Sequence, residues 1–467
     1  MNSTTKLPTT MLAMSLAAIL LGSCSKAAPT QTETTENVNP DKPTANARIQ
    51  IQAALGDPVK GSDIRYMTVV DGSSYYFAGR RDNPAGVGRI GSSGASQWFS
   101  SLPYALRGVS TLSPSASVPS GLVAVGKLDN DNDGFSDIGN AWLYTASGSL
   151  VSTLLFSSDS SDVWVNGIAA ISDSEFVLVG GERTPARENP LVAIVTLTAG
   201  GQLAKGPQVV LNGLSNSYFV SVVVNPAGPS GGQLHIYASS EVSAGSGPVT
   251  AINVHALTAA YPAMTSWNVD WSRNIPGAGP SLVVNDLRVF EDRIYLAGST
   301  DDTGKQPLPT NGGYWDSGLA ARLTLAGALE WTSTVRLTAH SERFMAVVPT
   351  SNGIFFMGSA GRYFIGQAID EFGYGWIAKI LPATGAVATN LTFGSDAYES
   401  GFYTGVYSGS TMYCGGFTNF ENQGGGYKSW FCGIDLANAV ASSAPAPAAA
   451  PISGRIGDSR TPGNDTR

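Results

Sequence analysis

The run Ile294-Tyr295-Leu296-Ala297-Gly298 is apolar and ends in glycine. Six further apolar runs that end in a small residue lie at 75–79, 122–126, 176–180, 234–239, 354–358 and 412–415. They recur roughly every 50–60 residues, and such a period is typical of repeat architectures, in which one unit cannot bury its apolar face alone. The sequence therefore predicts seven repeated units.

Each unit can be divided into four strands. In the sixth unit, the strands are expected at 343–348, 353–358, 375–380 and 385–393. Asn352-Gly353 between the first two is a strong tight-turn signal. Seven four-stranded antiparallel units predict an all-β fold, a seven-bladed β-propeller.

The two ends of the repeat region provide a test of this fold. The last repeat has only three strands, at 402–406, 411–415 and 429–436, whereas an additional strand at 49–55 precedes the first repeat. We expect residues 49–55 to supply the missing fourth strand. This pairing would close the ring and remove free strand edges.

The terminal segments differ in composition from the repeats. An apolar stretch at 11–21 follows Lys6 and is too short for a permanent membrane span, but it suits a secretory signal. Residues 25–47 and 441–467 contain too few large apolar residues to form a core. We expect a signal peptide at 1–23, a flexible tether at 24–47, the propeller at 48–438 and a disordered Ala/Pro-rich tail at 439–467.

The end of the signal segment, Leu21-Gly22-Ser23-Cys24, resembles a bacterial lipobox. The resemblance implies cleavage before Cys24 and acylation of Cys24, with palmitate among the expected acyl groups. Because Ser25 rather than Asp follows, it also implies an outer-membrane lipoprotein that faces the periplasm or the cell surface. Several acyl chains would hold a soluble domain at a membrane. The alternative is an ordinary cleaved signal with a chance cysteine.

Two segments of the repeats, 294–300 and 375–380, resemble the propeller repeats of bacterial secreted and surface lipoproteins. The resemblance covers about residues 49–436 and implies a seven-bladed ring. Because this fold carries many unrelated chemistries, it does not by itself imply an activity.

Composition and motifs narrow the function classes. The chain has 27 Lys and Arg against 35 Asp and Glu and no basic run, so nucleic acid is not an expected partner. It contains no His-Glu-x-x-His or P-loop motif. These observations favour a binding module over an enzyme, and we expect this module to be a monomer.

Two cysteines remain if Cys24 is acylated. Cys414 aligns with Ala78 before the repeat glycine, and Cys432 aligns with Ala378 on the neighbouring strand. Export to an oxidising compartment then predicts a disulfide between them. The alternative is a pair of buried free thiols.

Residues 129–137, DNDNDGFSD, place four carboxylates around a glycine. Calcium loops require oxygen ligands at positions 1, 3, 5 and 9 and glycine at position 6. The pattern assigns as ligands the side chains of Asp129, Asp131, Asp133 and Asp137 and the carbonyl oxygen of Phe135. No helices flank this loop, and Asn140 stands where an EF-hand has Glu, so we predict a structural Ca²⁺ rather than an EF-hand. A solvated acidic turn is the alternative.

The loops between second and third strands are long and must emerge on one face of a propeller. They lie at 127–140, 181–190, 299–317, 359–374 and 416–428. Their aromatic residues in the last three repeats are Tyr314, Trp315, Tyr363, Phe364, Tyr374, Phe417, Phe420 and Tyr427. Aromatic residues on a loop-rich face are typical of recognition surfaces, which predicts binding of a protein, peptide or glycan. The alternative is that these rings pack over the blade edges.

A second function class is a polysaccharide hydrolase or lyase. It would need two acidic residues that converge at the mouth of the central channel. The candidates are Asp301, Asp302, Asp370 and Glu371. A role in outer-membrane protein assembly is a third possibility and depends on fold analogy alone.

Overall fold

The computed structural model describes residues 51–55, 62–80, 85–102, 105–112, 120–129, 137–156, 162–184, 187–214, 216–243, 249–303, 316–337, 341–362, 373–394, 400–418 and 428–436. The chain divides into the units Met1–Thr30 and Gln31–Arg467, and every described residue belongs to the second. Cys24 and the residues predicted to form the signal peptide, tether and tail lie outside the described residues.

The described residues form seven four-stranded antiparallel sheets, as the period predicted. Blade 1 contains β2 (Asp63–Val69), β3 (Ser74–Arg80), β4 (Ala85–Gly91) and β5 (Ser96–Leu102). Blade 2 contains β6 (Ala105–Leu112), β7 (Gly121–Asp129), β8 (Asp137–Thr145) and β9 (Leu150–Phe156). Blade 3 contains β10 (Asp162–Ala170), β11 (Glu175–Arg183), β12 (Glu188–Leu197) and β13 (Leu203–Val210), and the short 3₁₀ helix η1 (Asn212–Leu214) follows it.

The remaining blades continue the pattern. Blade 4 contains β14 (Ser217–Val224), β15 (Gln233–Ser243), β16 (Val249–Ala260) and β17 (Asn268–Ile275). Blade 5 contains β18 (Leu282–Phe290), β19 (Arg293–Asp301), β20 (Asp316–Thr324) and β21 (Leu329–Val335). Blade 6 contains β22 (Ser341–Thr350), β23 (Gly353–Arg362), β24 (Tyr374–Ile380) and β25 (Val387–Phe393). Blade 7 contains β26 (Ser400–Ser408), β27 (Thr411–Thr418), β28 (Lys428–Asp435) and β1 (Ile51–Leu55).

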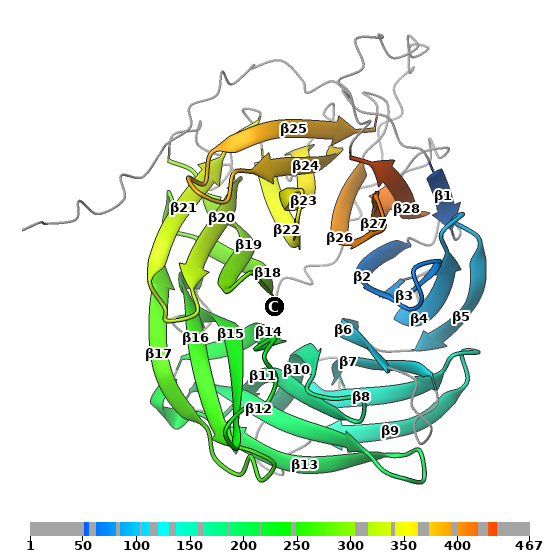
Figure 1. The fold of residues 1–467 in the computed structure, drawn as a ribbon, viewed down its shortest axis with the longest axis vertical. Helices are drawn as coiled ribbons and strands as arrows, with labels where there is room; N and C mark the ends of the chain where they lie inside the picture. The colour runs from blue at the N-terminus through cyan, green and yellow to red at the C-terminus, as the bar shows by residue number, and fades with distance from the viewer. Residues whose placement is uncertain are drawn as a thin grey trace, which may run out of the picture. The chain divides into compact units, whose positions relative to one another are not determined.

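The first strand of each blade is innermost (Figure 1). Strands β2, β6, β10, β14, β18, β22 and β26 contact one another in that order, and β26 contacts β2 again. The blades therefore form a closed ring around an axis.

The ring is closed as the sequence predicted. Strand β1 pairs antiparallel with β28, with Gln52 opposite Cys432. The turn of blade 1 also packs on β1, because a Cβ atom at Gly94 would lie 2.7 Å from the Cβ of Ala53. The beginning of the chain thus completes blade 7 and contacts blade 1.

Apolar side chains fill the space between adjacent blades. One cluster joins Tyr295 and Trp331 of blade 5 to Phe344, Phe356 and Trp376 of blade 6. Full burial of such a side chain contributes about 1.5–3 kcal/mol. Each sheet thus buries its apolar faces against its neighbours, which is why a single repeat would not be stable alone.

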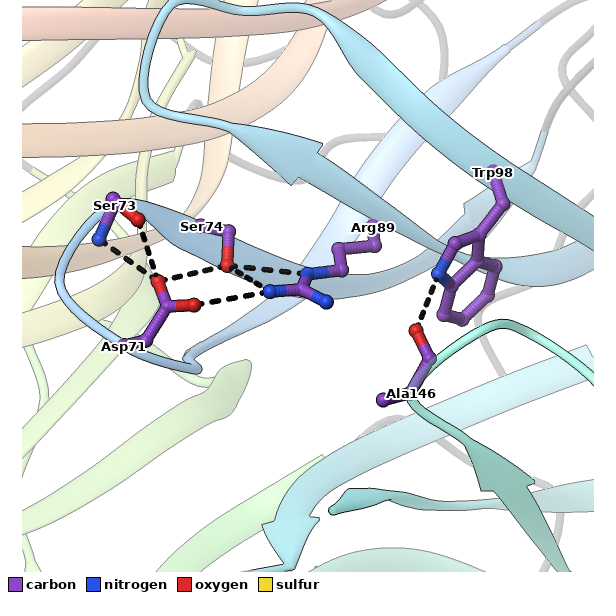
Figure 2. A network of polar contacts seen from close by, with 6 residues as sticks. All are labelled: Asp71, Ser73, Ser74, Arg89, Trp98 and Ala146. Carbon is purple, nitrogen blue, oxygen red and sulfur yellow. Dashed lines mark hydrogen bonds and ion pairs between the residues drawn. The ribbon is translucent and has the colours of Figure 1, made fainter.

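A tryptophan of an outer strand packs on the next blade at three places. The indole nitrogens donate to turn carbonyls: Trp98 to Ala146 at 2.8 Å, Trp271 to Leu325 at 3.1 Å and Trp331 to Pro382 at 2.7 Å. In the same turns, a Cβ atom at Gly148, Gly327 or Gly385 would lie 2.6–2.8 Å from the indole ring. Figure 2 shows the first of these contacts beside the Asp71–Arg89 ion pair of blade 1. Because these turn glycines also have positive φ, both ring contact and backbone conformation require glycine there.

Each innermost strand contains a β-bulge. The bulge inserts one residue per blade: Arg65, Arg107, Asn166, Val220, Asn285, Met345 and Tyr403. We call these seven residues the axial ring. A bulge leaves the extra residue unpaired and bends the strand.

The bulge explains the repeated small residue. The residue before the bulge pairs with Gly79, Gly126, Gly180, Ser240, Gly298, Gly358 and Gly416 in blades 1 to 7. At Gly79, Gly180, Gly298, Gly358 and Gly416, a Cβ atom would lie only 1.7–2.2 Å from a carbonyl oxygen of the innermost strand. In repeats four and seven the structural position is therefore Ser240 and Gly416, one residue after the predicted Ser239 and Gly415.

Candidate functional site

One face of the ring carries the second-to-third-strand loops, and we call it the loop face. Its longest connections span 302–315, 363–373 and 419–427, whereas the first-to-second-strand turns of the same blades are only 291–292, 351–352 and 409–410. The predicted gathering of long loops on one face is confirmed in blades 5, 6 and 7, whereas β11 and β12 occupy most of the predicted loop 181–190 and leave only 184–187 between them. The loop face is therefore the first place to look for a site.

Each residue of the axial ring lies at the midpoint of its innermost strand or between the midpoint and the loop face. All seven side chains are half-buried. Asn166 Nδ2 donates to the carbonyl of Phe219 in the next blade at 2.8 Å, and Asn285 Nδ2 donates to that of Phe344 at 2.7 Å. These bonds link neighbouring blades at the axis.

The closing junction has its own axial contact. The guanidinium carbon of Arg65 in blade 1 lies 5.8 Å from the ring centre of Tyr403 in blade 7. A cation over an aromatic face is attracted by about 0.5–2 kcal/mol, depending on solvent exposure. Arg65 also donates from Nε to Asp63 at 3.0 Å, so its charge is matched within its own strand.

Two of the predicted binding aromatics are described, and both are buried. Tyr374 is 1% exposed and Phe417 is 4% exposed. Phe417 packs 5.2 Å from Tyr403, and a Cβ atom at Gly401 would lie 2.6 Å from its ring. At these two positions, packing within the blades is therefore the alternative that the structure supports.

The other predicted aromatics lie outside the described residues. They are Tyr314, Trp315, Tyr363, Phe364, Phe420 and Tyr427. Their contribution to the loop face remains a prediction.

Asp301 forms a carboxyl pair with Asp316. The two residues are register partners at the ends of β19 and β20, their side chains are hydrogen-bonded, and Arg343 is ion-paired with Asp316. Burial, together with the negative charge of Asp316, raises the pKa of Asp301 to about 6. Retaining glycosidases separate their two carboxyl groups by about 5–5.5 Å, and inverting enzymes by more. Two carboxyl groups in hydrogen-bond contact do not have that separation.

Asp302 is fully engaged in a buried ion pair. It is 0% exposed, accepts from Arg336 through both carboxylate oxygens, and accepts from Ser317 Oγ at 2.6 Å. This carboxylate is inaccessible to a substrate. The remaining candidates, Asp370 and Glu371, lie outside the described residues.

Cys414 and Cys432 are free, buried thiols. They are direct register partners in β27 and β28. Burial raises the pKa of both thiols. Cys432 aligns with Ala378 as expected, but Cys414 aligns with Phe356 rather than with Ala78, because the repeat glycine is Gly416. No disulfide joins these two described cysteines, so the predicted bond stays a prediction.

The predicted calcium loop is described only at its ends. Asp129 and Asp137 are backbone register partners at the ends of β7 and β8. Their side chains, with Asp131, Asp133 and Phe135, lie outside the described residues. Within the described part of the chain, no three His, Cys, Asp or Glu side chains are grouped as a metal site. The Ca²⁺ site remains a prediction.

His255 is a packed core histidine. Its Nε2 is hydrogen-bonded to Ser240 Oγ at 2.8 Å, and its Nδ1 to Ser272 Oγ at 2.7 Å. Burial lowers the pKa of His255 to about 4. The imidazole is therefore neutral at physiological pH and packs within blade 4.

Sequence reasoning did not identify the axial ring. Its members share no residue type, so no motif marks them. The signal that locates them is indirect: each lies in the strand that pairs with the repeated glycine. None of the described residues forms a helix long and apolar enough to cross a bilayer.

Comparisons with known proteins give a likeness of fold alone. No protein-family model and no curated protein matches the chain. Among solved structures, the chain is similar to hydrazine synthase of Kuenenia stuttgartiensis (TM-score 0.49, 9% identity, covering 79% of this chain and 95% of that one). It is also similar to a catalytically inactive virginiamycin B lyase of Staphylococcus aureus (0.45, 10%, 82% and 98%) and to Drosophila Plexin A in complex with Semaphorin 1b (0.40, 8%, 84% and 88%).

Proposed function

We propose that the protein is an exported, lipid-anchored binding module that takes a protein, peptide or glycan partner on its loop face, over the axis. The observation that carries the proposal is the axial ring. One backbone position recurs in all seven blades with five different residue types: arginine, asparagine, valine, methionine and tyrosine. Because the bulge accepts all of them, the backbone does not dictate the residue type at this position, and a partner could select it.

Other groups on the loop face support the same role. In blade 3, the guanidinium of Arg183 lies 5.6 Å from the ring centre of Trp164 and is ion-paired with Glu188. Arginine and aromatic residues are enriched at interfaces. This cluster offers a second contact region away from the axis.

The entry point of the chain is compatible with an anchor at Cys24. Strand β1 pairs Leu55 with Ser429 and Ile51 with Gly433, while β28 begins at the loop face. The chain therefore enters β1 from the opposite face. A tether that begins at an acylated Cys24 would join the domain there and leave the loop face unobstructed.

Affinity capture from envelope extracts of the native organism tests the proposal. The ring variant is Met345→Glu, and the matched control is Leu381→Glu in the turn after β24, on the opposite face, where the side chain is 43% exposed. We expect wild type and Leu381→Glu to retain the same protein or glycan, and Met345→Glu to lose it while keeping its melting temperature. Equal retention by both variants would argue against recognition over the axis.

A further inference from the structure

We infer that the axial ring contains a carboxylate-binding site at Arg107. This inference rests on the proposed binding function and specifies the chemical class of the ligand. Arg107 is the bulge residue of β6. Its Nε is buried and has no hydrogen-bond partner. The ion pairs found between described residues, such as Arg65–Asp63, Arg89–Asp71 and Arg183–Glu188, do not include Arg107.

The equivalent arginine of the neighbouring blade shows what is missing. Arg65 occupies the same bulge position and donates from Nε to Asp63, two residues earlier in the strand. In blade 2, the residue two positions before Arg107 is Ala105. Blade 2 therefore repeats the arginine of blade 1 without the acid that accompanies it.

A buried guanidinium nitrogen without an acceptor requires an explanation. Buried polar groups are almost always hydrogen-bonded, and charged groups lose most when they are not. The axial ring itself contains no carboxylate, since its other members are Arg65, Asn166, Val220, Asn285, Met345 and Tyr403. An acceptor brought by a ligand would fill the position that Asp63 fills in blade 1.

The charge balance favours a carboxylate over a phosphate. Among the axial-ring residues only Arg65 and Arg107 carry a charge, and Arg65 is ion-paired with Asp63. A carboxylate carries one negative charge and matches the planar donor fork of a guanidinium. The group could belong to a uronic acid or to a peptide C-terminus, because both present the same carboxylate.

Nuclear magnetic resonance of the arginine Nε–H groups tests the site in the mature chain. The protein is labelled with ¹⁵N-arginine and titrated at constant ionic strength with sodium glucuronate, N-acetylalanine or inorganic phosphate. The Arg107 signal is assigned as the one absent from Arg107→Lys. We expect the Arg107 signal to shift and reach saturation as a carboxylate is added. Tighter binding of glucuronate would indicate a sugar acid as the ligand, and tighter binding of N-acetylalanine would indicate a peptide C-terminus.

Arg89 is the internal control, because it lies toward the opposite face and is ion-paired with Asp71. The matched variant is Ala105→Asp, which gives blade 2 the acid of blade 1 and should weaken carboxylate binding at least about tenfold while leaving Arg107 in place. Tighter binding of phosphate than of either carboxylate, or equal responses of Arg107 and Arg89, would overturn the inference.

The two proposals can fail separately. If the Arg107 signal does not titrate but capture remains sensitive to Met345→Glu, the carboxylate site is wrong and the binding face stands. If the Arg107 signal shifts with the ligand but Met345→Glu captures the partner as well as wild type does, the carboxylate site stands and the proposed partner surface is wrong.

Discussion

The carbonyl oxygen of Arg343 lies 1.7 Å from the place that a Cβ atom of residue 358 would occupy. This contact joins the bulge of β22 to the glycine of β23 that pairs with Phe344. The repeated glycine of the sequence is therefore explained by the β-bulge of the innermost strand. The bulge turns a carbonyl toward the neighbouring strand, and only glycine leaves room for it.

Replacing Gly358 by alanine should destabilise the protein. The conflict is with backbone rather than with a flexible side chain, so relief requires movement of an innermost strand, and we expect a loss of about 1–3 kcal/mol. Gly213→Ala is the control, because no atom lies within 4 Å of a Cβ atom there. Urea unfolding at 25 °C measures both variants, and equal midpoints would contradict the steric account.

Trp331 should stabilise the contact between blades 5 and 6 in two ways, through its hydrogen bond and through the packing of its ring. Trp331→Phe removes the bond from Nε1 to Pro382 but keeps a ring on Gly385, which should cost about 1 kcal/mol. Trp331→Ala removes the ring as well and should cost about 3–5 kcal/mol. Thermal unfolding provides the comparison. A phenylalanine variant as unstable as the alanine variant would show that ring packing contributes little.

Stability should fall with acid because of His255. Its pKa is lowered by burial from 6.5 to about 4, so the unfolded chain binds this proton more readily between those values. Neutral His255 therefore contributes about 3 kcal/mol to the free energy of unfolding above pH 6.5, and this contribution is lost as the pH falls toward 4. His255→Gln should flatten the stability profile in this window. An unchanged profile would mean that the imidazole is charged or relaxed in the folded protein.

The raised pKa of Asp301 acts in the opposite direction and must be separated from that of His255. A carboxyl group whose pKa is raised to about 6 contributes stability below its unfolded value of 3.8 and loses it as the pH rises through 6. For this reason the His255 comparison is made in an Asp301→Asn background as well as in wild type.

Cys414 and Cys432 should form a disulfide when the protein is taken from an oxidising envelope. Directly opposed residues of antiparallel strands have Cα atoms about 4.5–5.5 Å apart, within the range of natural disulfides. Mass spectrometry of non-reduced peptides should find them linked, and reduction should lower stability by about 3 kcal/mol. Recovery of both residues as alkylated thiols from unreduced, unfolded protein would contradict the prediction.

The number of blades could be predicted because its causes are local, and the closing strand because the last repeat lacks a fourth strand. A tight turn such as Asn352-Gly353 and a glycine facing a bulge such as Gly358 each leave a residue-type signature. In two repeats, the exact position of the small residue that faces the bulge could not be predicted. Ser239-Ser240 and Gly415-Gly416 are pairs of small residues, and the sequence does not indicate which member faces the bulge.

The candidate site was less predictable than the fold. The axial ring has no common residue type, so only strand pairing reveals it. Tyr374 and Phe417 were expected to face a partner because they lie near loops, yet both belong to strands and are buried. Near a strand end, one residue of register decides whether an aromatic ring enters the core or faces solvent.

Photo-crosslinking in living cells shows whether a partner binds over the axis. A p-benzoylphenylalanine is placed at Met345 in the axial ring or, as the control, at Leu381 on the opposite face. We expect light to produce a covalent adduct of higher mass from position 345 and none from position 381. Adducts from position 381 alone, or none from position 345, would contradict it.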